Sequence, residues 1–402
     1  MNKRTIRDLP ADLRGTRVLM RVDYNVPVSE GRVGDDRRIR ATLPTLGSLL
    51  DRGAAVVLMS HLGRPKGEWD ESLSLRPVAA RLDELIDATV RFVAAVVGEE
   101  ARTAAESLDA GEVLLLENTR FMAGEKENDP ELAEALARLG TAYASDAFGA
   151  AHRSHASTVG AGEAMRRKGG PVVAGLLMES EMKFLGGALG SPERPFVSII
   201  GGAKISGKID VMEHLLPRVD RLLIGGAMAN TFFAAMGLET GDSLVEDDRV
   251  EMAAGLLDRA GEKLLLPEDC RIAEEASEAS ETRTVPRDAV PTGWKILDIG
   301  PDTVAAFSDV VQGAGTVVWN GPMGMFEVAP FRGGTDGLAE AVAAATDRGT
   351  TTIIGGGDTA AAVTEAGLED RMTHVSTGGG ASLEFLEGRT LPGIAVLDDK
   401  EA

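Results

Sequence analysis

Cysteine is almost absent from this sequence, because Cys270 is the only one among 402 residues. The chain can therefore form no internal disulfide, and a metal site that uses several cysteines is excluded. A reducing compartment suits such a chain, so we expect it in the cytoplasm. No apolar run approaches the ~18 residues that span a bilayer, and the first residues show no secretory leader. We therefore expect a soluble protein without a membrane partner.

Positive charge is also in short supply. Lysine and arginine together number 42 against 63 aspartates and glutamates, which gives a formal net charge of -21. Nucleic acids and anionic membranes are polyanions, and such a chain repels them at long range, so we expect no nucleic-acid partner. An anionic small molecule would have to meet a local basic cluster.

The remaining composition is that of an ordinary globular protein, with 44% hydrophobic and 26% charged residues. A chain of this length exceeds what one hydrophobic core usually organises, so we expect two domains. In the first half, short apolar runs alternate with longer segments of helical spacing, such as 75–88 and 130–139. Such runs are typical of strands buried on both faces of a parallel sheet, and they lie at 17–22, 54–59, 90–97, 112–116, 142–145 and 171–174.

The second half repeats the pattern with runs at 196–200, 221–224, 263–266, 296–299, 316–319, 351–354 and 374–376. Glycine pairs or triplets follow several of these runs, whereas Asp, Asn, His and Arg follow the runs of the first half. The ligand of an open parallel sheet lies beyond the carboxyl ends of its strands, so the halves are expected to bind different ligands. We predict two doubly wound, Rossmann-like α/β domains, 1–176 and 191–388, joined by a hinge helix at 177–190.

Basic and polar side chains gather after the strands of the first half. Asp23 and Asn25 could bind hydroxyl groups, although such residues before a proline often only cap a turn. Guanidinium groups match phosphate and carboxylate oxygens, so a cluster of them favours a small, doubly anionic ligand. The cluster comprises Arg38, His61, Arg64, Arg120 and Arg153. A metal site at His61, His152 and His155 is disfavoured because no second ligand stands at a helical spacing.

The segment from Gly202 to Lys208 matches the start of a P-loop but has Ile209 where the Mg²⁺-binding Ser or Thr belongs. Either the match is a coincidence in a glycine-rich chain, or Lys204 and Lys208 share one helix face for another purpose.

The missing metal ligand has a candidate in the segment GGGDT at 355–359. Glycines there allow close backbone approach, a helix start favours phosphate, and Asp358 could hold Mg²⁺. A tight turn in which Asp358 is only a cap is the alternative. The glycines at 378–380 offer a second helix start for phosphate, and Glu327 could accept hydrogen bonds from ribose hydroxyls.

Together these segments closely resemble the phosphoglycerate kinase family. The motifs occur in family order and span nearly the whole chain: RVDYNVP (21–27), RRIRATLPT (37–45), SHLGRP (60–65), ENTRF (117–121), DAFGAAHRSHAS (146–157), GGAKISGKI (201–209), GGAMANTF (225–232), NGPMGMFE (320–327), GGGDT (355–359) and STGGGASLEFLEG (376–388). In this family the lysine-containing motif resembles a P-loop without being one, which explains Ile209.

The resemblance implies reversible transfer of a phosphoryl group between 1,3-bisphosphoglycerate and ADP, which gives 3-phosphoglycerate and ATP and depends on Mg²⁺. It implies that 3-phosphoglycerate is held by Asp23, Asn25, Arg38, His61, Arg64, Arg120 and Arg153. The nucleotide would be held by Lys208, Gly225, Gly324, Glu327, Gly356, Gly357, Asp358 and Thr359, with Asp358 on the metal. The transferring group would be stabilised by Arg38, Lys204, Lys208 and Gly379.

Family members are usually monomers, and the resemblance also implies that segment 389–402 returns to pack on the first domain. Two alternatives stand beside this interpretation. A kinase for another small acid would lack the basic cluster of the first half, and a non-enzymatic relative would have lost Lys208, Arg38 or Asp358. All of these residues are present.

Overall fold

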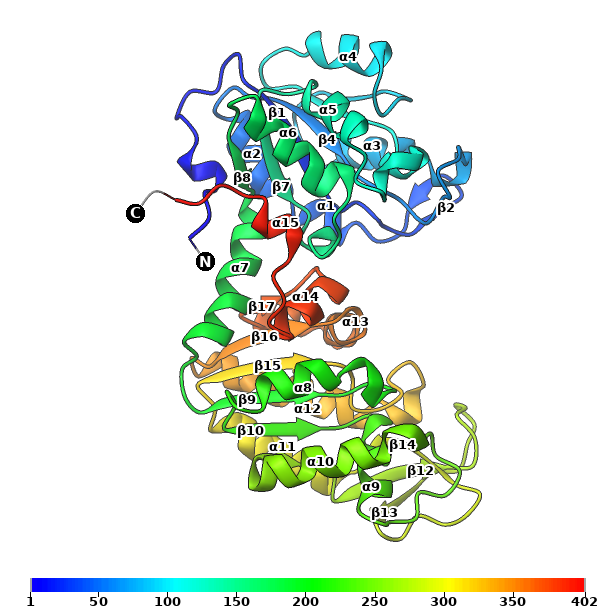
Figure 1. Cartoon of the computed structure of the whole chain (residues 1–402). Coiled ribbons are helices and arrows are strands. Elements are labelled where there is room, and N and C mark those ends of the chain that lie inside the picture. Colours follow the sequence, from blue (N-terminus) through cyan, green and yellow to red (C-terminus); the bar gives the residue numbers. More distant parts are fainter. Residues whose placement is uncertain (1, 401–402) are drawn as a thin grey trace. The chain divides into compact units, whose positions relative to one another are not determined.

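The computed structural model describes residues 2–400 and divides into two compact units (Figure 1). Within the described residues, the first unit runs up to Lys183 and resumes at Thr390, and the second is Phe184–Arg389. Helix α7 (Leu176–Gly190) therefore begins in the first unit and ends in the second. No helix among residues 2–400 is long and apolar enough to cross a membrane.

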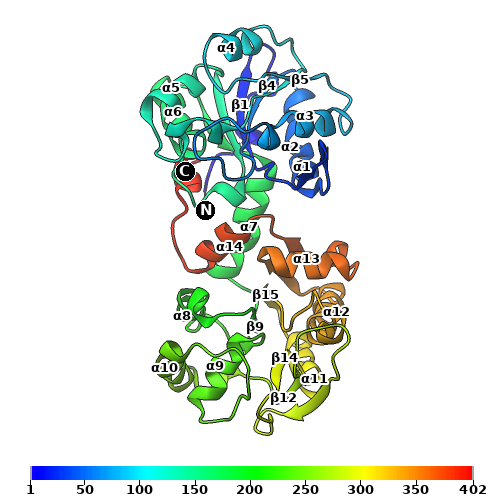
Figure 2. The ribbon, with the colours of Figure 1, turned by 90° about the vertical axis from the view of Figure 1, so that its right-hand side faces the viewer.

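The first unit is built on a six-stranded parallel sheet in the order β5-β6-β4-β1-β7-β8. The central strands are almost completely buried, because helices cover both faces: α5 and α6 lie on one side, and α2 and α3 on the other (Figure 2). The strands are β1 (Arg17–Val22), β4 (Ala55–Met59), β5 (Val90–Phe92), β6 (Val113–Leu115), β7 (Ala142–Asp146) and β8 (Val172–Ala174), with a small hairpin of β2 (Val28–Ser29) and β3 (Arg32–Val33).

The helices of this unit are short, and several begin with a proline in the first turn, where its fixed φ suits a helix start. They are α1 (Arg37–Arg40), α2 (Leu43–Leu50), α3 (Arg76–Asp83), α4 (Glu99–Glu106), α5 (Pro130–Ala137), α6 (Ala161–Arg167) and the last one, α15 (Pro392–Ala395). The chain end joins the sheet through Asp398, whose N–H donates to the carbonyl of Val172 over 2.8 Å.

The start of α7 is fixed by a buried carboxyl group at the end of β7. Asp146 accepts hydrogen bonds from Thr45 Oγ1 at 2.6 Å and from the N–H of Met178 at 3.0 Å. Gly175 leaves room for it, because a Cβ there would lie 2.2 Å from Asp146 Oδ1. Burial raises the pKa of Asp146 to about 7.

The second unit repeats the architecture with the strand order β11-β10-β9-β15-β16-β17, again all parallel. Its strands are β9 (Phe196–Ile200), β10 (Arg221–Ile224), β11 (Leu264–Leu265), β15 (Thr316–Asn320), β16 (Thr351–Gly355) and β17 (His374–Val375). Helices α8 to α10 lie on one side and α11 to α13 on the other (Figure 2). The helices are α8 (Ile209–Leu215), α9 (Met228–Ala235), α10 (Val250–Ala260), α11 (Pro301–Gln312), α12 (Gly333–Asp347), α13 (Gly357–Glu365) and α14 (Gly379–Leu386).

The prediction of two parallel α/β domains is confirmed, but one predicted strand was assigned to the wrong sheet. The run 296–299 belongs to β14 (Lys295–Ile299), which pairs antiparallel with β12 (Asp269–Ala273) in a separate sheet completed by β13 (Arg283–Pro286). An apolar run carries no information on strand direction, which the connections set. The sequence pattern missed β12 and β13 because charged residues interrupt both.

Replacing a leucine with alanine tests which side chains of the second unit belong to its hydrophobic core. Leu223 on β10 is fully buried in the hydrophobic core, whereas Leu244 is 48% exposed. We expect Leu223→Ala to destabilise the unit by about 2–4 kcal/mol through lost burial and a cavity, and Leu244→Ala to change stability by less than about 0.5 kcal/mol. Calorimetric unfolding measures both. Equal transition temperatures for the two variants would contradict the core assignment.

Candidate active site

Neighbouring strands of the first unit end at the same level, which places their following residues along one edge of the sheet. Arg21 of β1 pairs with Met59 at the end of β4, and Val22 pairs with Asp146 at the end of β7. The residues predicted from the sequence lie just beyond: Asp23 and Asn25 after β1, His61 and Arg64 after β4, Arg120 after β6 and Arg153 after β7, with Arg38 on α1.

Asp23 connects the loops that follow β1 and β4 with helix α1. Arg38 Nη1 donates to Asp23 Oδ2 over 3.1 Å and to the carbonyl of Asn25 over 3.2 Å. His61 Nδ1 lies 3.8 Å from Asp23 Oδ1. Asn25 Oδ1 accepts a hydrogen bond from the N–H of Gly63 at 2.9 Å. These contacts bring Asp23, Asn25, Arg38 and His61 into one set of polar groups.

The surroundings of His61 fix its protonation state. Its Nδ1 lies 3.0 Å from Nη2 of Arg21, and a guanidinium group can only donate. Nδ1 therefore accepts, which leaves the proton of the neutral ring on Nε2. Burial lowers the pKa of His61 well below its usual value, and the charges of Arg21, Arg120, Arg153 and His155 lower it further. At neutral pH this residue is a neutral hydrogen-bond donor.

Arg120 is buried and incompletely hydrogen-bonded. Its Nη1 donates to the carbonyl of Gly63 over 2.6 Å, but its Nε has no partner among the described residues. Burial and the charges of Arg153 and Arg21 lower the pKa of Arg120 to about 10, against the opposite effect of Glu125 and Asp23. Crowded guanidinium groups with an unpaired buried N–H are suited to an anionic ligand.

Arg64 is the one member of the predicted cluster that remains apart. It is exposed, and no hydrogen bond or ion pair links it to another residue in the part of the chain from 2 to 400. Arg153 is half-buried, and its Nε donates to Nε2 of His152 over 3.0 Å.

The sequence prediction missed the buried groups that stand behind this edge. Arg21 is fully buried within β1, and its Nε donates to Ser157 Oγ over 2.8 Å. Ser157 Oγ donates in turn to Oε1 of the fully buried Glu125 over 2.5 Å, and Ser157 N–H donates to Oε2 over 2.9 Å. Glu125 thus provides negative charge for Arg21 through one hydroxyl group. An arginine inside the apolar run VLMRV was the available signal, since a buried charge requires a partner.

In the second unit, Lys208 and Asn320 form the centre of the polar edge. The ammonium of Lys208, just before α8, donates to Asn320 Oδ1 at the end of β15. Burial lowers the pKa of Lys208 to about 8, although Asp358 and Glu387 act in the opposite direction. Asn320 Nδ2 is buried and has no hydrogen-bond partner in residues 2–400. The Lys208 ammonium and the adjacent Asn320 Nδ2 are both donors, and such a pair suits phosphate oxygens. The sequence analysis did not predict Asn320 as a site residue.

Helix α13 begins at the same edge. Strand β16 ends at Gly355, and Gly356 turns the chain with a φ of +89°, which favours glycine. Gly357 and Asp358 form the first turn, where free N–H groups favour anions. Thr359 is buried, and its Oγ1 accepts a hydrogen bond from the N–H of Gly321 at 2.7 Å, which joins this turn to the loop after β15.

Asp358 fits a magnesium ligand better than a helix cap. Gly356 occupies the cap position, no side chain caps the helix, and Asp358 is exposed without a hydrogen bond or ion pair among the described residues. Mg²⁺ is commonly held by one or two carboxylates together with the phosphates of a substrate, and it keeps several waters. A lone carboxylate beside a helix start whose N–H groups favour anions meets that requirement. No group of three potential side-chain ligands occurs within residues 2–400.

The remaining predicted phosphate-binding residues lie on separate turns. Lys204 is exposed and precedes the 3₁₀ helix Ile205–Gly207, whereas Lys208 follows it, so the interpretation that both share one α-helix face is wrong. The segment tightens into a 3₁₀ turn before α8 begins, which breaks the helical spacing. Gly379 opens α14, and a Cβ placed on it would meet no other atom within 4 Å.

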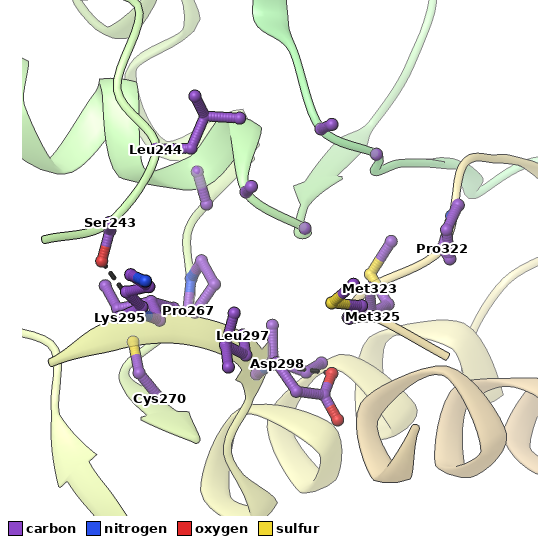
Figure 3. A pocket seen from close by; sticks show the side chains of 18 of the residues that line it. Ser243, Leu244, Pro267, Cys270, Lys295, Leu297, Asp298, Pro322, Met323 and Met325 are labelled. Atoms are coloured by element: carbon purple, nitrogen blue, oxygen red, sulfur yellow. Dashed lines mark hydrogen bonds between the residues drawn. The ribbon is translucent and has the colours of Figure 1, made fainter. Parts of the chain in front are cut away.

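A cavity of about 780 Å³ adjoins this edge (Figure 3). That volume is within the range of small-molecule sites. Of the predicted residues, Gly324, Glu327 and Asp358 line it. Gly225 does not, but it is buried behind Met323, since a Cβ there would lie 2.4 Å from the sulfur.

The cavity also has an apolar wall that the sequence prediction omitted. Leu244 and Met325 are exposed by 48% and 40% and both line the cavity, which leaves them available to a ligand. Other apolar lining residues include Ala203, Phe233, Leu297, Pro322 and Met323. A flat, apolar group such as a nucleotide base suits this wall. Its residues come from a helix, a strand and several loops, so no local sequence pattern indicated it.

Comparisons with known proteins agree with this geometry. A family model described as "Phosphoglycerate kinase" matches residues 6–389. The chain is 55% identical to a phosphoglycerate kinase of Herpetosiphon aurantiacus and 54% identical to one of Rubrobacter xylanophilus, in both cases over 100% of each chain. The phosphoglycerate kinase structure from Coxiella burnetii superposes with a TM-score of 0.87 at 39% identity, covering 98% of both chains. That from Pyrococcus horikoshii gives 0.84 at 32% identity with the same coverage.

The protonation state of His61 can be tested by ¹⁵N NMR of the five histidines, with His61→Gln to assign its signals. We expect shifts of the neutral Nε2–H form throughout the range from ~pH 5.5 to ~pH 8, because burial and Arg21 oppose protonation. A signal that titrates near its ordinary pKa would contradict the assignment.

The same residue makes stability depend on pH. Below about pH 6.5 an unfolded chain protonates His61 whereas the folded protein does not, so this group lowers stability as the pH falls. His61→Gln removes that contribution. Its transition temperature should therefore fall less steeply with acidification than that of the parent.

Proposed function

Because the chain belongs to the phosphoglycerate kinase family, we propose that it transfers a phosphoryl group reversibly between 1,3-bisphosphoglycerate and ADP, which gives 3-phosphoglycerate and ATP. The observation that carries this proposal is the basic edge of the first unit, in a chain whose formal net charge is -21. A phosphate and a carboxylate on one small molecule match such a concentration of donors.

We assign binding of 3-phosphoglycerate to the first unit. Arg38 and His61 donate toward the acid, and Arg120 offers its unpaired Nε. The contacts among Asp23, Asn25 and Arg38 hold that arginine in place before a ligand arrives. Arg64 and Arg153 are the remaining residues that we assign to binding of 3-phosphoglycerate.

The nucleotide belongs to the second unit in this proposal. Its base and ribose occupy the cavity between Leu244, Met325 and Glu327. Lys208 and Asn320 donate to phosphate oxygens, as do the N–H groups of Gly357 and Asp358 at the start of α13. Gly225, Gly324, Gly356 and Thr359 shape this edge. Mg²⁺, when bound by Asp358 and the phosphates, neutralises charge on the transferring group.

The chemistry requires no general base. The attacking group is the substrate's carboxylate, which is already ionised at neutral pH, so one of its oxygens attacks the γ-phosphorus while the bond to the bridging β-phosphate oxygen breaks. The protein contributes positioning and positive charge: Arg38 orients the carboxylate, and Lys208 donates to the phosphoryl oxygens. Lys204 and the N–H of Gly379 are proposed as further donors. The protein is proposed to act as a cytoplasmic monomer.

A coupled assay of ADP formation from ATP, 3-phosphoglycerate and Mg²⁺ tests the reaction. We expect parent activity, and in Lys208→Ala a loss of at least about 100-fold in kcat, since removal of one donor to a developing charge typically costs that much. Lys66→Ala, a change at an exposed lysine to which no role in binding or transfer is assigned, is the control. The assay is run at low and high salt. Absence of activity in the parent under both conditions, or full activity in Lys208→Ala, would refute the proposal.

Transfer between ligands held by separate units requires that the two ligands meet, and we propose that the units close around them, which would also exclude water from the acyl phosphate. We propose that α7 takes part in this motion as a hinge. Solution X-ray scattering should show a smaller radius of gyration with both ligands present than with either alone. Identical profiles in all three states would argue against closure.

A further inference from the structure

Asp298 is a buried carboxylate among the residues that line the cavity (Figure 3). It lies on β14 beside Leu297 and is 4% exposed. Its Oδ1 accepts a hydrogen bond from the N–H of Ile299 at 2.9 Å, and its Oδ2 accepts one from the N–H of Gly334 at 2.7 Å. No ion pair involves it within residues 2–400. Gly334 is in the first turn of α12, whose positive end stabilises a carboxylate.

Two glycines press against this carboxylate from different elements. A Cβ on Gly324 would lie 2.1 Å from Asp298 Oδ1, and a Cβ on Gly334 would lie 2.3 Å from the same atom. Gly334 belongs to α12, and Gly324 belongs to the loop that follows β15. Asp298 therefore sets the distance between helix and loop, and only glycine fits at the two contact points.

The same loop is held at three further points. Thr335, next to Gly334 and fully buried, accepts hydrogen bonds at Oγ1 from the N–H groups of Met323 at 3.0 Å and Gly324 at 3.3 Å. The N–H of Met325 donates to the carbonyl of Leu297 over 2.9 Å. The loop is thus fixed on one side by β14 and on the other by α12.

This loop supplies much of the cavity wall. Its residues Pro322, Met323, Gly324, Met325 and Glu327 all line the cavity. It also begins at Asn320, the partner of Lys208. A shift of the loop would therefore move the apolar wall and the phosphate-binding donors together.

We propose that Asp298 is a positioning residue for the nucleotide: its two oxygens are engaged by backbone N–H groups, and it acts by holding loop 320–327 in the conformation that binds the base and the phosphates. Thr335 is its partner in this role. The inference rests on the proposed function, because it takes the cavity as the nucleotide site. It assigns to this carboxylate an effect on nucleotide affinity and none on the acid bound by the first unit.

The carboxylate is also placed to respond to pH. Burial raises the pKa of Asp298 to about 7, against the hydrogen bonds from Gly334 and Ile299. Of the charged groups around it, Asp336 on α12 raises the pKa and Arg271 on β12 lowers it. Cys270 on β12 stays neutral, since burial raises its pKa to about 12. Protonation removes a negative charge and one acceptor beneath the loop, so nucleotide affinity should decline as the pH falls below 7.

Asp269 provides a matched control. It lies in the same sheet, is 5% exposed and holds the start of α11 by accepting hydrogen bonds from the N–H groups of Thr303 at 2.8 Å and Asp302 at 3.1 Å. A Cβ on Gly300 would lie 2.1 Å from its Oδ2. It repeats the arrangement of Asp298 but does not line the cavity.

The experiment is calorimetric titration of the full chain with MgATP and, separately, with 3-phosphoglycerate at pH 8 and pH 6. We expect Asp298→Asn to weaken MgATP binding at pH 8 by about tenfold, and to leave 3-phosphoglycerate binding within about twofold. Asp269→Asn should leave both affinities within about twofold of the parent. The loss of nucleotide affinity between pH 8 and pH 6 should be smaller in Asp298→Asn than in the parent and in Asp269→Asn.

The outcomes separate this inference from the proposed function. A parent that binds neither ligand overturns both. If the parent binds both ligands and the MgATP affinity of Asp298→Asn equals that of the parent or of Asp269→Asn, only the role of Asp298 is overturned. If Asp298→Asn does not fold, Thr335→Val replaces it, because that change removes the acceptor for Met323 and Gly324 and keeps the side-chain shape. Unchanged MgATP affinity in a folded Thr335→Val also overturns the inference.

Discussion

The level ends of parallel strands are the constraint on which both candidate sites depend. In the first unit, β1, β4 and β7 end within one residue pair of each other, and in the second unit Ile200, Asn320 and Gly355 pair across β9, β15 and β16. Residues far apart in the sequence therefore leave the sheet at one edge. The first unit places arginines there, whereas the second places glycines and one lysine, so the same architecture presents two chemically different edges.

This arrangement buries charge, which is unfavourable. In the first unit a set of buried residues behind the edge, Arg21, Ser157 and Glu125, compensates for it in part. The cluster around His61 concentrates positive charge where water is excluded, and Arg21 adds another guanidinium group behind it. Glu125 adds a compensating negative charge, which reaches Arg21 through the hydroxyl group of Ser157. The result is a neutral imidazole of fixed tautomer among cations, which suits a reaction in which the substrate brings its own negative charge.

The sequence predicted the two sheets well because the strands buried on both faces are nearly continuous apolar runs. Most of the residues that the sequence analysis singled out lie a few positions after a strand end, although Asn320 at the end of β15 was missed. The direction of 296–299 was wrong and β12 was missed, because apolar content does not encode direction and Asp269 and Arg271 interrupt the pattern. The buried residues behind the first edge, Arg21, Ser157 and Glu125, were not predicted for another reason. Arg21 and its partner Ser157 are 136 residues apart, and no local pattern connects them.

One arrangement recurs in the fold: a buried aspartate begins a helix and leaves no space for a side chain on the glycine beside it. Asp146 does so with Gly175 at α7, Asp269 with Gly300 at α11, and Asp298 with Gly334 at α12, with gaps of 2.1–2.3 Å to the absent Cβ. No amino acid carries a carboxylate on a shorter stem than aspartate, so neither partner can be replaced first without a clash or an unpaired helix start. Each pair is therefore sterically coupled, and a larger residue at the glycine position needs a compensating change at the aspartate.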